Sequence, residues 1–122
     1  MAVFTKRFFS GSSGGRSVSI ATGLTTIHTS VSGTNDSDEV FFYVHNTASV
    51  SRKVTAYVGA TLAKDKVVQA VPPRDGYYLV GPGMPLGLGK ILKALSTAGV
   101  TATGVAVAGT LTAWGWVNRI DQ

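Results

Sequence analysis

The chain has 122 residues, of which 44% are hydrophobic, and this fits one globular domain with a single core. The lack of cysteine excludes a disulfide framework and a thiolate metal site. Eleven Lys and Arg against six Asp and Glu give a net charge of +5, which can favour nucleic acid or an acidic protein surface. In the sequence these positive charges are spread along the chain rather than gathered in a run.

The apolar stretches are shorter than the roughly 20 residues that a membrane helix needs. Lys6 and Arg7 are followed by Gly and Ser where a secretory signal would have an apolar core. We therefore expect synthesis in the cytoplasm and no membrane partner.

Residues 1–16 are expected to form an extended, basic, Gly/Ser-rich arm in front of a β-sandwich domain of residues 17–122. Residues 11–15 have the composition of a flexible linker. Three phenylalanines, Phe4, Phe8 and Phe9, would be costly to leave in solvent. We therefore expect the arm to pack on its own domain or on a neighbouring molecule.

Alternation of apolar and polar residues predicts the first strands. Residues 17–30 indicate one or two strands with a break near Gly23, followed by a loop of turn formers at 32–38. Residues 39–47 form the clearest strand, with Val40, Phe42 and Val44 on one face and Phe41, Tyr43 and His45 on the other. Residues 46–49 then read as a hairpin loop leading into a strand at 51–60.

Further strands are predicted at residues 66–71 and 77–80, and the first of these ends at two prolines. Residues 81–90 read as a long structured loop before a strand at 90–95. Residues 100–107 and 110–120 suggest a closing hairpin around positions 108 and 109. The sum is about eight strands, which predicts an all-β, single antiparallel β-sandwich of jelly-roll-like type.

Several motifs that suggest chemistry have simpler explanations. The pattern G-x-S-x-G at residues 11–15 lacks the strand and helix of a nucleophile turn, so a linker explains it better. His28 and His45 are not in a metal-ligand spacing. Residues 35–39 offer carboxylate oxygens but lack the length and the glycine of an EF-hand loop, and a solvated turn is the leading reading. The glycines at 81–90 fit no phosphate-binding motif.

These readings predict a protein that is not an enzyme and has no cofactor, no metal and no catalytic residue. General acid–base catalysis usually needs histidines and carboxylates, which are scarce here. Aromatic and basic residues alternate around Lys6 and Phe8, as single-strand nucleic-acid binders require, but a sandwich surface explains them equally well. Trp114 and Trp116 are expected to be core or interface anchors.

Four segments in order carry a resemblance to a known class of proteins: D-E-V-F-F-Y-V-H-N-T (38–47), V-P-P-R-D-G-Y-Y-L-V-G-P-G (71–83), M-P-L (84–86) and W-V-N-R-I (116–120). Together they resemble small β-sandwich virion structural proteins of tailed bacteriophages, with capsid decoration, or cement, proteins as the closest class. The resemblance covers residues 25–120 and is a pattern of strands and turns.

The resemblance implies a virion protein that binds the outer surface of the assembled head and stabilises contacts between major capsid protein subunits. It implies a homo-oligomer, with a homotrimer favoured. Nucleic acid is not expected as a partner. The expected contact residues lie in the arm and near the long loop: Phe4, Lys6, Arg7, Phe8, Phe9, Arg74, Tyr77 and Met84. Two alternatives stay open, a phage tail, baseplate or fibre adaptor module and a nucleic-acid-binding β-barrel.

Overall fold

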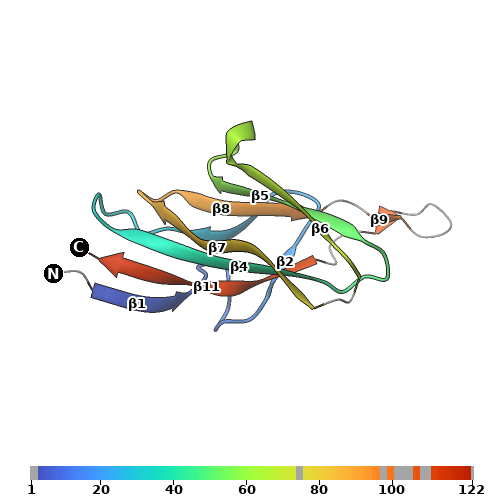
Figure 1. Ribbon diagram of the computed structural model, residues 1–122, viewed down its shortest axis with the longest axis horizontal. Coiled ribbons are helices and arrows are strands. Elements are labelled where there is room, and N and C mark those ends of the chain that lie inside the picture. The colour runs from blue at the N-terminus through green and yellow to red at the C-terminus, as the bar shows by residue number, and fades with distance from the viewer. Residues whose placement is uncertain (1–2, 74–75, 97–98, 101–105, 108–110, 122) are drawn as a thin grey trace.

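Two antiparallel β-sheets pack face to face in the protein (Figure 1). The structure is a computed structural model, and it describes residues 3–73, 76–96, 99–100, 106–107 and 111–121. Sheet A consists of β1 (Val3–Phe8), β2 (Val18–Ile20), β4 (Ser37–Asn46), β7 (Tyr77–Gly87) and β11 (Leu111–Asp121). Sheet B consists of β3 (Thr25–Thr29), β5 (Arg52–Gly59), β6 (Lys66–Val71) and β8 (Ile91–Ser96). A short 3-10 helix, η1 (Ala63–Asp65), and the pair β9 (Gly99–Val100) and β10 (Ala106–Val107) complete the described elements.

The strand order is that of a jelly roll. Without β1, sheet A runs β2-β11-β4-β7 and sheet B runs β3-β8-β5-β6. Most consecutive strands therefore alternate between the two sheets, and every pairing is antiparallel. The all-β sandwich predicted from the sequence is confirmed, and β1 is an additional strand beside β2 on the free edge of β11.

The core lies between the sheets and follows the predicted alternation. On β4, Val40, Phe42 and Val44 are fully buried, and on β5, Val54 and Ala56 are buried opposite them. Each fully buried Val, Leu, Ile or Phe side chain contributes about 1.5–3 kcal/mol relative to an exposed one. Since the chain has no cysteine to form a disulfide, this burial holds the two sheets together, and the strand ladders act within each sheet.

The predicted hairpin at residues 46–49 is wrong, because β4 and β5 belong to different sheets. Residues 47–51 instead carry the chain from sheet A to sheet B. The buried side chain of Asn46 fixes this crossing: its amide nitrogen donates to the carbonyl oxygens of Val50 (2.9 Å) and Val71 (2.8 Å). Its carbonyl oxygen accepts a hydrogen bond from the backbone N–H of Ala48 at 2.9 Å.

The predicted loop at 81–90 is mostly strand, since β7 continues to Gly87. β7 is the edge strand of sheet A, so Pro82 and Pro85 can sit in it without removing a ladder donor from the sheet interior. Two register shifts against β4 lie on either side of Pro82, whereas Pro85 stays in register opposite Glu39. The turn itself follows at Leu88 and Gly89, which both have positive φ, at 55° and 69°.

The predicted closing hairpin is replaced by other pairings. β10 pairs with β9, whereas β11 pairs with β4 on one side and with β1 and β2 on the other. The turn expected at positions 108 and 109 lies outside the described residues. The strand predicted at 90–95 is confirmed as β8.

The N-terminal segment packs on its own domain. β1 forms six antiparallel pairs with β11, from Val3 opposite Asp121 to Phe8 opposite Trp116. The two strands run side by side at the left of Figure 1. The next residue, Phe9, is only 2% exposed and its ring lies 6.4 Å from that of Phe42. Phe9 therefore anchors β1 to the core.

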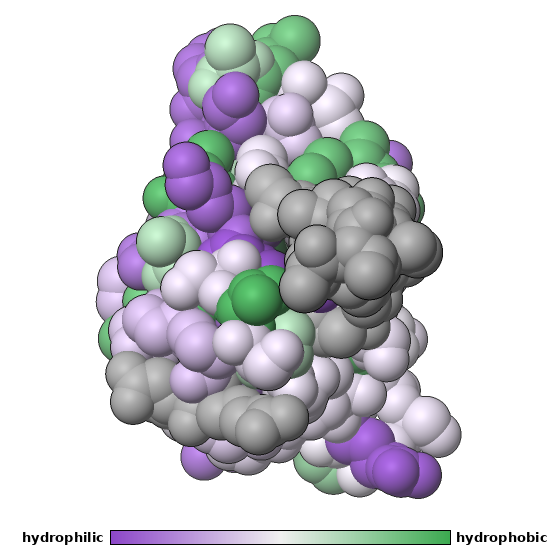
Figure 2. Space-filling model, turned by 90° about the vertical axis from the view of Figure 1, so that its right-hand side faces the viewer, coloured by the Kyte–Doolittle hydropathy of each residue, from purple (hydrophilic) through white to green (hydrophobic). Residues whose placement is uncertain are grey.

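At the opposite end of the sandwich, where β9 lies, the hydrophobic side chains are scattered over the surface. Figure 2 shows this end, and among its coloured side chains the hydrophobic ones form separate patches between hydrophilic and intermediate ones. Within the described part of the chain, no helix has both the length and the apolarity to cross a membrane.

The anchoring role of Phe9 gives a stability prediction. Phe9→Ala should lower the free energy of unfolding by about 3–5 kcal/mol, because it leaves a cavity in the core. Phe8→Ala is the matched control: Phe8 is 62% exposed, so its loss should change stability by less than about 1 kcal/mol. Urea unfolding followed by tryptophan fluorescence measures both. Equal losses for the two variants would contradict this assignment.

Candidate binding surface on the outer face of sheet A

Alternation along β4 and β11 gives sheet A an aromatic outer face. Residues whose neighbours point into the core must point outward, and the ladder places Phe41 opposite Trp116 and Tyr43 opposite Trp114. On the flanking strands, Phe8 lies opposite Trp116 and Leu79 lies opposite Tyr43. The outer face therefore presents large side chains from β1, β11, β4 and β7.

The rings on this face form one connected cluster. Phe41 stacks on Trp116 with centroids 5.1 Å apart, and Tyr43 lies 6.0 Å from Trp116 and 5.9 Å from Trp114. Tyr77 extends the cluster to β7, with its ring 5.7 Å from that of Trp114. Such pairs contribute about 0.5–1.5 kcal/mol each beyond their buried area. The rings therefore hold one another in place on the sheet.

Part of this cluster remains accessible. Tyr77 is 54% exposed, Leu79 49% and Trp114 37%, and at the β1 end Phe4 is 69% exposed. Aromatic side chains that are rigid yet exposed are enriched at protein interfaces, because they provide contact area at low entropic cost. The outer face of sheet A therefore has the composition of a binding surface.

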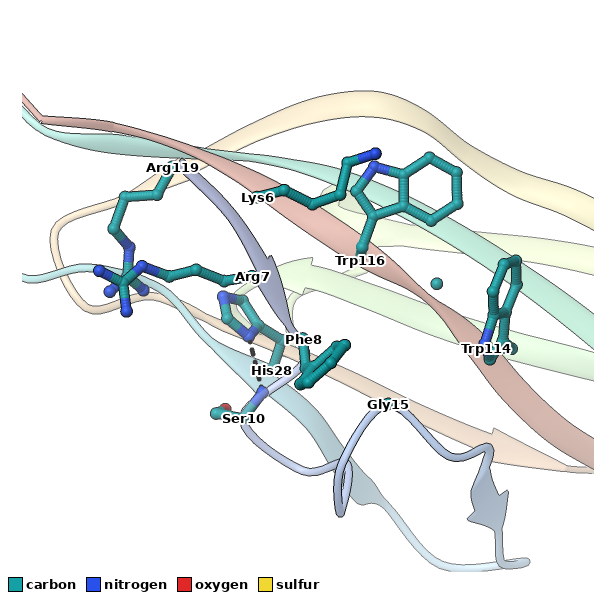
Figure 3. Close-up of a pocket in the computed structure, with 10 residues that line it drawn as sticks. Lys6, Arg7, Phe8, Ser10, Gly15, His28, Trp114, Trp116 and Arg119 are labelled. Atoms are coloured by element: carbon teal, nitrogen blue, oxygen red, sulfur yellow. Dashed lines mark hydrogen bonds between the residues drawn. The ribbon is translucent and has the colours of Figure 1, made fainter. Parts of the chain in front are cut away.

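A pocket of about 840 Å³ opens where β1 and β2 leave a gap along the edge of β11 (Figure 3). β1 pairs with β11 from residue 116 onward and β2 pairs with residues 111–113, so Trp114 and Gly115 lie between them. Figure 3 shows Phe8 and Trp114 on either side of this gap, with Lys6 along Trp116. The Lys6 ammonium lies 5.2 Å from the Trp116 ring centroid, a cation–π contact.

Gly15 forms one wall of the pocket, and its position accepts only a residue without a side chain. Its φ is +84°, a conformation that other residues rarely adopt. A Cβ there would also lie 2.9 Å from the Phe8 ring, so any side chain would displace that ring. Gly15 therefore shapes the pocket wall, in a segment that the sequence suggested was only a flexible linker.

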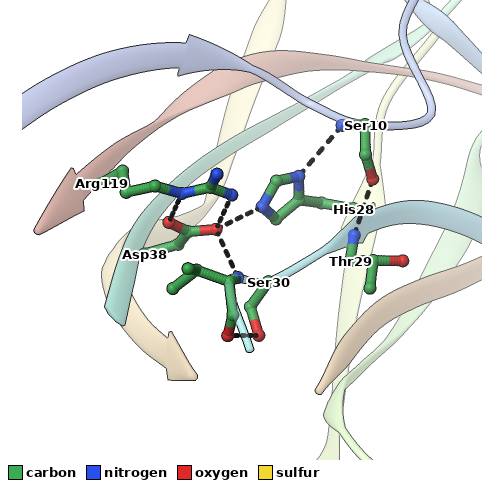
Figure 4. A network of polar contacts seen from close by, with 7 residues as sticks. Ser10, His28, Thr29, Ser30, Asp38 and Arg119 are labelled. Carbon is green, nitrogen blue, oxygen red and sulfur yellow. Dashed lines mark hydrogen bonds and ion pairs between the residues drawn. The ribbon is translucent and has the colours of Figure 1, made fainter. Parts of the chain in front are cut away.

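Beneath the pocket lies a buried polar network centred on Asp38 (Figure 4). The Asp38 carboxylate is fully buried and accepts two hydrogen bonds from Arg119, from Nε at 2.8 Å and from a terminal guanidinium nitrogen at 3.0 Å. It also accepts from His28 Nε2 at 2.7 Å and from the backbone N–H of Val31 at 3.2 Å. Sheets A and B are thereby joined through one carboxylate.

The protonation of His28 follows from its other nitrogen. Nδ1 accepts a hydrogen bond from the backbone N–H of Ser10 at 3.0 Å, so it carries no proton. The neutral ring therefore carries its proton on Nε2 and donates it to Asp38. The Ser10 hydroxyl oxygen accepts from the backbone N–H of Thr29 at 2.7 Å. This arrangement ties the segment after β1 to β3 and occupies both histidine nitrogens.

The surroundings of Asp38 lower its pKa. Burial by itself raises the pKa of a carboxyl group, but the hydrogen bonds from Arg119 and His28, together with the positive charge of Arg119, outweigh it. The pKa of Asp38 therefore lies below its usual value of 3.8. Hydrogen bonding to Asp38 in turn raises the pKa of Arg119. Asp38 is therefore a structural anion at neutral pH.

The structure separates the sequence-predicted contact residues rather than bringing them into one site. Phe4, Lys6 and Phe8 lie on the outer face of β1, and Tyr77 lies on the outer face of β7, where its ring is 5.4 Å from that of His45. Arg7 lines the pocket, Phe9 is in the core, and Met84 is half-buried opposite Val40. Arg74 lies outside the described residues.

The candidate cation sites are dispersed by the fold. His28 points into the core and His45 points outward, so the two cannot share an ion. Of the acidic residues in the 35–39 turn, Asp38 is occupied by Arg119 and His28, while Glu39 faces the other side of β4. Among the described residues, no group of three His, Cys, Asp or Glu side chains is placed to hold a metal ion.

Trp114 and Trp116 lie on the outer face of sheet A rather than in the core. Of the two roles expected for them, the core role is therefore excluded, and the role of interface anchor stays a prediction. Their shared face was visible in the sequence, since residues 114, 116 and 118 alternate with small or apolar ones. The ion pair between Asp38 and Arg119 was not visible, because the two residues are 81 positions apart.

No family model matches the chain, and no curated protein or solved structure is significantly similar to it.

Asp38 gives a pH-dependent stability prediction. Because its pKa is lower in the folded state, it stabilises the protein above the unfolded pKa and ceases to do so as the pH falls through the folded pKa. Asp38→Asn should therefore cost about 3 kcal/mol at pH 7, where it leaves Arg119 unneutralised. The difference from wild type should shrink below pH 4.

Urea unfolding of wild type and Asp38→Asn between pH 7 and about pH 2.5 measures this difference. Asp65→Asn is the control, since Asp65 lies at the surface in η1. A stability gap between wild type and Asp38→Asn that stayed constant over the whole range would show that ionisation of Asp38 is not its cause.

Proposed function

We propose that the protein is a non-enzymatic virion structural protein that decorates the assembled head of a tailed bacteriophage. Its partner is the major capsid protein, and it stabilises contacts between shell subunits as a homo-oligomer, with a trimer favoured. The observation that carries the proposal is the outer face of sheet A, where exposed aromatic and apolar side chains from β1, β7 and β11 are displayed on a rigid sandwich.

The fold supports this proposal in a general way. Double-sheet jelly rolls occur in many viral capsid proteins, although they also occur in lectins and cupins, so the fold alone does not decide the function. The closest acid–base pair in the described residues, Asp38 and His28, is buried and joins the two sheets. The proposal therefore gives these two residues a structural role.

Binding through a broad face suits a protein that is present in many copies. The exposed side chains extend from Phe4 at one edge of sheet A to Leu79 at the other. On a shell, many such contacts of modest strength add through multivalency, so no single deep site is needed. The net charge of +5 would suit an acidic shell surface.

The first experiment measures the copy number of the protein in purified particles. Quantitative mass spectrometry relative to the major capsid protein should give a ratio near one or a simple fraction of one. A handful of copies per particle would place the protein in the tail or neck, which is the alternative reading. Complete absence from particles would overturn the proposal.

The second experiment tests the face that makes the contact. Leu79→Glu places a charge on the outer face of sheet A, and it should reduce the copy number on heads at least about tenfold, because a buried unpaired charge is costly. Val68→Glu is the matched control, since Val68 is 50% exposed on β6 of sheet B and Leu79 is 49% exposed. Equal occupancy by the two variants would exclude this face as the contact.

A further inference from the structure

Folding brings the basic residues of the N-terminal segment next to Arg119 and the aromatic residues of β11. Lys6, Arg7 and Arg119 line the 840 Å³ pocket beside β1, and Arg16 lines a second pocket of about 610 Å³. Both pockets are lined by Gly15 and Trp114, so they adjoin there and together make up one stretch of surface along the edge of β11. We call it the basic–aromatic groove; its charged and aromatic residues are Lys6, Arg7, Phe8, Arg16, Tyr77, Trp114, Trp116 and Arg119.

The charge in this groove is available to a ligand. None of the described residues that line it is an aspartate or a glutamate. Arg119 is neutralised by Asp38 beneath the groove, but within the described part of the chain no carboxylate forms an ion pair with Lys6, Arg7 or Arg16. The groove therefore offers three cations to an anionic ligand.

The groove also offers rings with accessible surface. Phe8 is 62% exposed, Tyr77 54% and Trp114 37%. The rings of Trp114 and Tyr77 lie 5.7 Å apart, and Figure 3 shows Phe8 and Trp114 on either side of the gap between β1 and β2. A row of rings flanked by cations is how proteins hold a strand of bases, which stack on the rings while the phosphates contact the charges.

We infer that the basic–aromatic groove binds single-stranded nucleic acid with little sequence preference. Arg16 contacts a phosphate, and so do Lys6 and Arg7, which reach the ligand from opposite faces of the edge strand β1. Bases stack on Phe8, Trp114 and Tyr77. The sequence pI of about 9.8 agrees with such a partner. A duplex fits less well, because its bases are stacked on one another and cannot lie on protein rings.

An acidic polypeptide is the competing ligand, and the strand pairing disfavours it. A peptide gains most from adding a strand to an open sheet edge. Here β1 and β2 already occupy that edge of β11 and leave only Trp114 and Gly115 between them. A polypeptide would therefore use the charges but not the backbone, whereas a nucleic acid uses both the charges and the rings.

The test uses the full chain and a fluorescent oligothymidylate of about 12 nucleotides, which forms no secondary structure. Fluorescence anisotropy should show binding whose log affinity falls with log salt concentration with a slope of about −2, because three phosphate contacts contribute about 0.7 each. Arg7→Glu/Arg16→Glu should lower the affinity at least tenfold and flatten the slope to about −0.7.

Two further variants locate the site. Lys64→Glu/Lys66→Glu makes the same change in net charge on exposed residues of η1 and β6, away from the groove, and should retain most of the affinity. Phe8→Ala removes one ring and should lower the affinity about tenfold while leaving the salt slope unchanged. Thermal melting of each variant confirms that it is folded.

Three outcomes would overturn the inference. The first is no binding of the oligothymidylate at low salt, and the second is an equal loss in the groove and control double variants. The third is competition by polyglutamate or by duplex DNA as effective as that by unlabelled oligothymidylate, which would identify an acidic polypeptide or a general polyanion as the ligand. None of these results depends on head attachment, so the inference and the proposed function fail independently.

Discussion

The ladder between β4 and β11 is the constraint on which the rest of the structure depends. Ten consecutive antiparallel pairs join these strands, from Ser37 opposite Ile120 to Asn46 opposite Leu111. Because side chains alternate along both strands, one register places Val40, Phe42 and Val44 in the core and the aromatic cluster outside. A shift by one residue would exchange the two faces. The same register brings Asp38 next to Arg119, so the buried ion pair and the binding surface have one origin.

Local patterns in the sequence predicted the strands well. The alternation at 39–47 and 51–60 identified both strands, and at 39–47 it separated the residues of the two faces without showing which face is buried. Pro72 marked the end of β6. The pairing of strands was harder to predict, because a short connection such as 47–51 reads as a hairpin whether it joins neighbours or crosses between sheets. β7 was shortened in the prediction because prolines usually end a strand, and only its position at the edge of sheet A explains why Pro82 and Pro85 are tolerated.

The binding surface was partly visible in the sequence, and the groove was not. The aromatic residues of β1, β7 and β11 could be recognised as candidates for contacts from their type. Their assembly into one face depends on pairings between residues more than 70 positions apart, such as Phe41 with Trp116. The groove was hidden because Trp114 and Trp116 are about 100 positions from Lys6 and Arg16, and only the pairing of β1 and β2 with β11 brings them to the same edge. Which distant residues meet depends on the order in which the strands pair, and the pattern of a single sequence does not reveal that order.

The central place of β11 also has a consequence for how the protein is made. This strand follows all the strands of sheet A to which it pairs, and it lies between β4 and the two N-terminal strands β1 and β2. During translation, sheet A therefore remains open along the edge of β4 until β11 has left the ribosome, and β1 and β2 have no strand to join. The ordering of the N-terminal segment is thus a late event, and its long-range closure is expected to make folding slow for a domain of this size.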